Sequence, residues 1–198
     1  MPLHPEWRLR LSPDRVPEDP AVRRAGVAIV VRELAGAPPG VLLMKRAEHP
    51  LDPWSGQVSL PGGRVDPTDA DSRAAAQREA LEELGVDLAR DGELVGGLDP
   101  LPATAKGAKV DLAVHPWIWR VERDLPIVTN EEAEEGFWLS LPDLAAGALD
   151  HTHRIERRGE TLLRPAWLAP SGARRHVVWG LTYHILRRFV EAVGDAAR

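Results

Sequence analysis

Three glutamates in the middle of the chain have the spacing to hold a cation together. Glu82 and Glu83 follow Glu79 by three and four residues within the run Arg-Glu-Ala-Leu-Glu-Glu-Leu-Gly. On a helix this spacing places all three carboxylates on one face. Like charges this close oppose helix formation by roughly a few tenths of a kcal/mol per pair, which a bound cation would offset. Oxygen ligands with no His or Cys nearby favour Mg²⁺ or Mn²⁺ over Zn²⁺.

Two neighbouring features support a phosphate site at these glutamates. Arg78 lies four residues before Glu82 and can also reach the loop that carries Asp69, so it is suited to orient carboxylates. Gly62 and Gly63 allow a sharp backbone turn that brings amides close to a phosphate. For the glutamates alone the alternative is an ordinary solvated helix face, because helices rich in Glu and Arg are common. The glycine pair upstream, at the end of an expected strand, favours the site.

The elements that must position these residues are those of one mixed α/β chain. A helix is expected over residues 72–84, because Asp71 or Ser72 can cap its start and Gly85 suits the left-handed position after its end. Apolar runs bounded by Gly and Pro predict strands, the first two forming a hairpin, at 25–34, 41–47, 57–63, 93–99, 111–121 and 134–141. Residues 100–110 are expected to form a loop. Apolar spacing predicts a short helix over 142–149 and a closing amphipathic helix over 176–193.

Composition limits the class of protein. The 198 residues include 30 acidic and 25 basic side chains, and this net charge of −5 argues against stable nucleic-acid binding. The absence of Cys excludes disulfides, thiol nucleophiles and thiolate metal sites, and it fits a reducing cytoplasm. No apolar run approaches the roughly 18–20 residues needed to cross a membrane. Residues 1–22 are expected to form an irregular lead-in, and residues 23–195 a single domain.

The acidic charge is concentrated around the glutamates. Residues 66–93 carry nine acidic and three basic side chains, so the rest of the chain has a net charge of +1. Bound divalent cations would reverse the local sign. The negative charge of this segment therefore excludes phosphate ligands only when no metal ion is bound.

The glutamates lie in a segment that resembles the Nudix box, the motif of the Nudix hydrolase family. Residues 78–86 match its second half, Arg-Glu-apolar-x-Glu-Glu-x-Gly-apolar, position by position. Asp69 stands where the box usually has its first Glu, and the spacing from Gly63 to Arg78 is one residue longer than usual. The longer spacing is similar to that of the coenzyme A pyrophosphatase branch of the family.

The resemblance to this branch extends beyond the box. Residues 42–47 (LLMKRA) and 56–63 (GQVSLPGG) are similar to its upstream motif, although Leu60 stands where Phe is usual. Residues 178–182 resemble its C-terminal helix. In all, the resemblance covers about residues 25–190.

The resemblance implies a Nudix-type α/β/α sandwich with a mixed central sheet, in the α/β (α+β) class. It also implies Mg²⁺- or Mn²⁺-dependent hydrolysis of the diphosphate linkage in a nucleoside diphosphate conjugate, with coenzyme A or a derivative as the first expectation. Other nucleotides are the alternative, namely oxidised nucleoside triphosphates, nucleotide sugars or dinucleotides, and so is a catalytically silent nucleotide-binding domain. The partner is thus a small nucleotide diphosphate, and a homodimer stays open.

The resemblance also assigns roles to residues of the box. Glu79, Glu82 and Glu83 would hold the cation, and Arg78 would orient carboxylates. The catalytic base would be Glu83 or a carboxylate from outside the box. Glu132 is the first candidate outside it, because its distance from the following strand resembles the branch pattern. A solvated loop before a strand is the alternative for Glu132.

Four further residues are expected at the substrate. Gly62 and Gly63 would bring backbone amides to the phosphates. Arg46, aligned with the branch motif at a strand end, would contact phosphate or the box, with a surface salt bridge as the alternative. Trp54, in a loop close to the glycine pair in sequence, would stack on a base or cover the site, with packing as the alternative.

Overall fold

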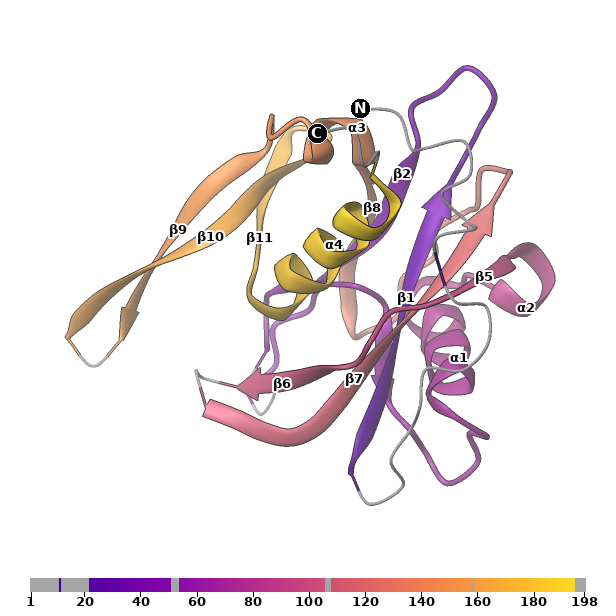
Figure 1. The fold of residues 1–198 in the computed structure, drawn as a ribbon, viewed down its shortest axis with the longest axis horizontal. Helices are drawn as coiled ribbons and strands as arrows, with labels where there is room; N and C mark the ends of the chain where they lie inside the picture. Colours follow the sequence, from indigo (N-terminus) through magenta and orange to yellow (C-terminus); the bar gives the residue numbers. More distant parts are fainter. Residues whose placement is uncertain (1–10, 12–21, 51–53, 106–107, 158, 195–198) are drawn as a thin grey trace.

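The computed structural model describes residues 11, 22–50, 54–105, 108–157 and 159–194. Its centre is a mixed sheet of eight strands among these residues (Figure 1). The strands are β1 (Arg24–Arg32), β2 (Gly40–Arg46), β3 (Val58–Ser59), β4 (Gly62–Arg64), β5 (Glu93–Gly97), β6 (Leu101–Ala105), β7 (Ala108–Val121) and β8 (Ala133–Ser140). β1 pairs in parallel with β7 and antiparallel with β2, so the expected hairpin of the first two strands is confirmed.

A second sheet and the helices lie around the central sheet. The second sheet has the order β11-β10-β9, and Figure 1 shows β9 and β10 extending from the body as an arm. Its strands are β9 (Asp150–Arg157), β10 (Glu160–Ser171) and β11 (Arg174–Trp179). The helices are α1 (Ser72–Leu84), α2 (Leu88–Asp91), α3 (Leu141–Ala145) and α4 (Gly180–Val193). None of the helices in the described residues is long and apolar enough to span a membrane.

The central sheet is buried on both faces, which explains why β1 is apolar between its terminal residues Arg24 and Arg32. Its residues alternate between two cores. Ala28 and Val30 belong to the core that contains the buried face of α1. Ile29 and Val31 belong to the core that contains α4 and the second sheet. The layered arrangement implied by the resemblance is thus present, and the layer on the α4 side also contains a three-stranded sheet.

The helix over residues 72–84 is confirmed residue for residue. The Asp71 carboxylate accepts a hydrogen bond of 2.8 Å from the Ala74 N–H and caps the start. Gly85 ends the helix in the left-handed conformation with φ of 67°. The cap chemistry read from the sequence therefore fixed both ends of the element that carries the glutamates.

Three expectations about secondary structure were wrong. The single strand over 57–63 is two short strands, since β3 pairs with β2 and β4 with β1. The expected loop over 100–110 contains β6 and the start of β7. The closing helix begins at Gly180, because Val177 and Val178 pair with β10 in β11. The short helix ends at Ala145, and the lead-in over residues 1–22 lies, except for Leu11 and Val22, outside the described residues.

Candidate active site

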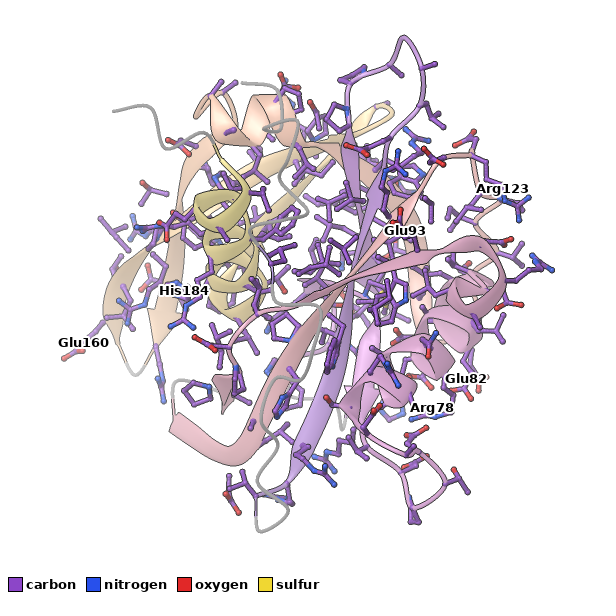
Figure 2. The ribbon with its side chains drawn as sticks, turned by 45° about the vertical axis from the view of Figure 1, so that its right-hand side comes forward. Arg78, Glu82, Glu93, Arg123, Glu160 and His184 are labelled. Atoms are coloured by element: carbon purple, nitrogen blue, oxygen red, sulfur yellow. The ribbon has the colours of Figure 1, made fainter. Side chains whose placement is uncertain are left out.

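Arg78 connects the acidic side chains of α1 to the loop before it. One guanidinium nitrogen, Nη1, donates hydrogen bonds of 2.9 Å to both Glu79 and Glu82. Nε and Nη2 donate to the Asp69 carboxylate at 3.2 and 3.0 Å, and Nη2 also donates to the Arg64 carbonyl at 3.2 Å. The hydrogen bonds from Arg78 hold the pKa of Asp69 below its usual value. Arg78 therefore orients carboxylates, as expected, and Figure 2 shows it beside Glu82 on α1.

Glu83 is the most deeply buried of the three glutamates, with its side chain 2% exposed. Its Oε2 accepts a hydrogen bond of 2.9 Å from the Gly62 N–H, and its Oε1 lies 3.6 Å from Nη1 of Arg46. Burial raises the pKa of Glu83 to about 8, since the favourable contact with the Gly62 amide offsets only part of the desolvation. Both oxygens of this carboxylate thus have a defined partner.

Glu79 and Glu132 bring further negative charge to Glu83. Burial is the main cause that raises the pKa of Glu79. The charge of Glu132 raises the pKa of both Glu79 and Glu83, which places its carboxylate within electrostatic range of the pair. Glu132 comes from the segment just before β8, far from α1 in sequence. The structure therefore brings the expected outside carboxylate to the box.

The glycine pair is required by close packing against this cluster. A Cβ at Gly62, whose φ is 152°, would lie 2.3 Å from the Gly26 carbonyl oxygen of β1. A Cβ at Gly63 would lie 2.2 Å from Oε1 of Glu79. Both distances are far inside van der Waals contact. Only glycine at these two positions lets the backbone turn between β1 and the Glu79 carboxylate.

The carboxylates fit a hard divalent cation. Glu83 is buried and Glu79 is mostly buried one helical turn before it, and burial raises the pKa of both carboxylates, so a nearby cation would favour their charged forms. Their donors are all oxygen, the type that Mg²⁺ and Mn²⁺ prefer. Glu82 is 52% exposed and, like Glu79, accepts a hydrogen bond from Nη1 of Arg78. Within the described residues no three acidic or imidazole groups already converge as a metal-binding cluster.

A cavity of about 860 Å³ opens beside this cluster. Its wall contains all four residues that the sequence places at the substrate: Arg46, Trp54, Gly62 and Gly63. Their side chains or backbone come from β2, the loop before β3, and β4. The structure thus joins the expected substrate residues to the carboxylates of α1.

The rest of the wall was not anticipated from the sequence. It includes apolar residues of β6, β7 and α4, and both strands of the arm. Arg64, Arg157, Arg164 and His184 are the basic residues there beside Arg46, and among the residues that the structure describes no Asp or Glu lines the cavity. The one available signal was the alternation of apolar and basic residues in Ile155-x-Arg157 and Leu162-x-Arg164, which is typical of strands with one ligand-facing side.

Comparison with known proteins gives a family match. Residues 22–158 match the NUDIX domain. The chain is similar to a Nudix hydrolase NudL of Salmonella paratyphi B, described as uncharacterized, with 35% identity over 187 residues that cover 93% of this chain and 90% of the relative. The corresponding NudL of Escherichia coli is 32% identical over 169 residues, covering 84% and 82%.

Two solved structures show the same fold. An Ap4A hydrolase binary complex of C. elegans is 24% identical with a TM-score of 0.50, over 63% of this chain and 85% of that one. A MutT/nudix family protein of Enterococcus faecalis is 17% identical with a TM-score of 0.53, over 90% and 63%. The likeness confirms the expected α/β fold with a mixed central sheet and flanking helices.

Proposed function

The chain belongs to the Nudix hydrolase family, whose members hydrolyse acid anhydrides, and we propose that it is a Mg²⁺- or Mn²⁺-dependent pyrophosphohydrolase of coenzyme A or a derivative. The proposal rests on one observation: the acidic cluster on α1 lies next to a large cavity whose wall is basic and apolar. A diphosphate at the junction would meet the cation on one side and Arg46 on the other. The cavity has room for the remainder of a large conjugate.

The residues of the cluster have different roles in hydrolysis. Glu79, Glu82 and Glu83 would hold the cation, and Arg78 keeps Glu79 and Glu82 oriented. A divalent cation held there would supply positive charge that offsets the negative charge of the diphosphate in the transition state. Arg46 lines the cavity beside the cluster, and its guanidinium would contact the same phosphates, whereas the Gly62 N–H is already donated to Glu83.

The reaction consumes one water. The water adds in line to one phosphorus, the P–O bond of the anhydride breaks, and the leaving phosphate takes the electron pair. For coenzyme A the products are adenosine 3′,5′-bisphosphate and 4′-phosphopantetheine. Since the three glutamates of the box are assigned to the cation, we assign the role of accepting the proton of the water to Glu132, whose charge acts on both Glu79 and Glu83.

A substrate panel tests the proposal. The protein is incubated with Mg²⁺ and, separately, coenzyme A, a nucleotide sugar, a dinucleotide and an oxidised nucleoside triphosphate, and the products are separated by chromatography. We expect coenzyme A to have the highest kcat/KM and a chelator to abolish turnover until Mg²⁺ or Mn²⁺ is restored. Preference for another substrate would replace coenzyme A and leave the hydrolase assignment in place. No turnover of any of them would indicate a silent nucleotide-binding domain.

Three expectations from the sequence stay predictions. They are the single domain over residues 23–195, a cytoplasmic location, and a homodimer as one of the open oligomeric states. Sedimentation of the full chain measures the last of these directly.

A further inference from the structure

The arm formed by β9 and β10 has two chemically different faces. Cross-strand pairing of Ile155 with Leu162 defines the inner face, and this face lines the cavity. Arg157 and Arg164 lie on the same inner face on opposite sides of this pair, Arg157 two residues from Ile155 toward the tip of the arm and Arg164 two residues from Leu162 toward its base. The outer face carries Arg154, whose guanidinium pairs with Glu156 at 2.8 Å. The arm thus presents apolar and basic side chains to the cavity and an internally paired surface to solvent.

The basic residues of the inner face have no acidic partner. Arg157 and Arg164 form no ion pair or hydrogen bond through their side chains with any residue that the structure describes. Glu160 is the cross-strand neighbour of Arg157, but it is not among the residues that line the cavity, and Figure 2 shows it at the tip of the arm, pointing outward from the body. His184 of α4 lines the same cavity and adds no negative charge. As far as the described residues go, the wall carries basic and no acidic side chains, which suits an anionic ligand.

This basic pair is built on a different sheet from the phosphate contacts of the active site. Arg46, Gly62 and Gly63 come from the central sheet, and they serve the diphosphate next to the carboxylates. Arg157 and Arg164 come from the second sheet, and apolar residues of β6, β7 and α4 complete the wall. A ligand that fills the cavity therefore meets two separate sets of cationic groups.

We propose that Arg157 and Arg164 form an anion subsite that binds a phosphate monoester of the substrate, distinct from the diphosphate that is cleaved. A guanidinium group can donate two parallel hydrogen bonds to the oxygens of a phosphate, which the ammonium group of a lysine cannot do. The inference rests on the proposed function, because coenzyme A carries this group as its 3′-phosphate. The arm then selects coenzyme A over nucleotide conjugates that have only the diphosphate.

The test compares coenzyme A with 3′-dephospho-coenzyme A in the full-length protein. The wild type is expected to prefer coenzyme A in kcat/KM. In Arg157→Gln and Arg164→Gln this preference should fall by about tenfold or more, the effect of one lost charge-assisted contact. Turnover of the dephospho compound should stay within about twofold of wild type, because its diphosphate contacts are intact.

Arg154→Gln is the matched control. It makes the same charge change on the same arm, but on the outer face. It should leave the ratio of the two substrates unchanged. An equal loss for both substrates in the inner-face variants, an unchanged ratio, or the same change in the control would overturn the subsite.

A binding experiment separates this inference from the proposed function. Calorimetry measures the affinity of the wild type and both inner-face variants for adenosine 3′,5′-bisphosphate and for AMP. Tighter binding of the bisphosphate that is lost in the variants supports the subsite even where coenzyme A is not hydrolysed, a result that would refute the proposed function alone. Equal affinity of the wild type for the two nucleotides overturns the subsite, whatever the activity.

Discussion

The backbone N–H of Gly62 donates a hydrogen bond of 2.9 Å to Oε2 of Glu83, a residue 21 positions later in the chain. The bond joins the turn before β4 to the buried face of α1. Together with Arg46 at 3.6 Å from Oε1, it fixes the one carboxylate of the box that solvent barely reaches. The relationship explains why the glycine pair and the glutamates occur together, since the turn supplies a donor that the buried charge needs.

Replacing Glu83 by Gln should separate activity from stability. The substitution removes a charge at the proposed cation site, so we expect kcat to fall by about 10²- to 10⁴-fold. The fold should persist, because the amide oxygen still accepts from Gly62 and the buried charge is gone. Steady-state kinetics and thermal unfolding measure the two effects. The control is Glu191→Gln, which breaks an exposed pair with Arg187 on α4 and should leave kcat unchanged. Near-normal turnover in Glu83→Gln would contradict the assignment of the acidic cluster.

Gly63→Ala tests the close packing against Glu79. The new Cβ would lie 2.2 Å from Oε1 of Glu79, so this carboxylate must move. A displacement of about 1 Å at a reacting centre costs on the order of 10²-fold in rate, and we expect kcat/KM to fall by about that factor. Gly40→Ala in β2 is the matched control, because its nearest contact would be an ordinary 3.4 Å. Equal activity of the two variants would show that the position of Glu79 is unimportant.

The sequence predicted the part of the site that depends on local chemistry. The cap at Asp71, the left-handed Gly85 and the glutamate spacing determine α1 and its acidic face without reference to the rest of the chain. Only the family resemblance predicted that Arg46 and Glu132 approach this face. In the structure, the pairing of β2 with β8 brings them together. Spacing along the chain contains no such information.

The arm could not be predicted for a physical reason. Residues 150–157 and 160–165 form a two-stranded ribbon that is largely exposed, so burial imposes little apolar alternation on it. The signal that remains, an apolar and a basic residue two positions apart on each strand, acquires meaning only when pairing puts Ile155 opposite Leu162. Residues 176–179 at the end of β11 were wrongly predicted as helix, because Val177 and Val178 precede a strongly amphipathic segment.

Arg78→Ala should weaken both the fold and cation binding. Arg78 makes hydrogen bonds to three carboxylates and one carbonyl, and its loss leaves Glu79 and Asp69 without their cationic partner. We expect the free energy of unfolding to fall by about 1–3 kcal/mol and the Mg²⁺ concentration for half-maximal activity to rise. Denaturant unfolding and a Mg²⁺ titration of activity measure these. Arg187→Ala, which removes an exposed i,i+4 pair, should change neither by a comparable amount. An unaltered Mg²⁺ requirement in Arg78→Ala would exclude its role in orienting the carboxylates.

The buried charge of Glu83 should make the metal-free protein less stable as pH rises. The folded pKa of Glu83 is about 8 against an ordinary value of 4.5, so between these values the folded protein holds a proton that the unfolded chain releases. The free energy of unfolding must then decrease with pH across this window, by at most about 1.4 kcal/mol per pH unit. Burial lowers the pKa of His153 and His184, and their effect has the opposite sign below about pH 6.5.

The difference between wild type and Glu83→Gln isolates this effect, since both proteins carry the same histidines. In the presence of chelator, the stability of the wild type relative to Glu83→Gln should fall steadily from about pH 5 to pH 8, as measured by urea unfolding at each pH. Added Mg²⁺ should remove most of that fall, because a cation beside Glu83 favours the charged carboxylate. A difference that stays constant with pH would mean that Glu83 is ionised in the metal-free fold, and that the cluster does not need a cation to hold its charge.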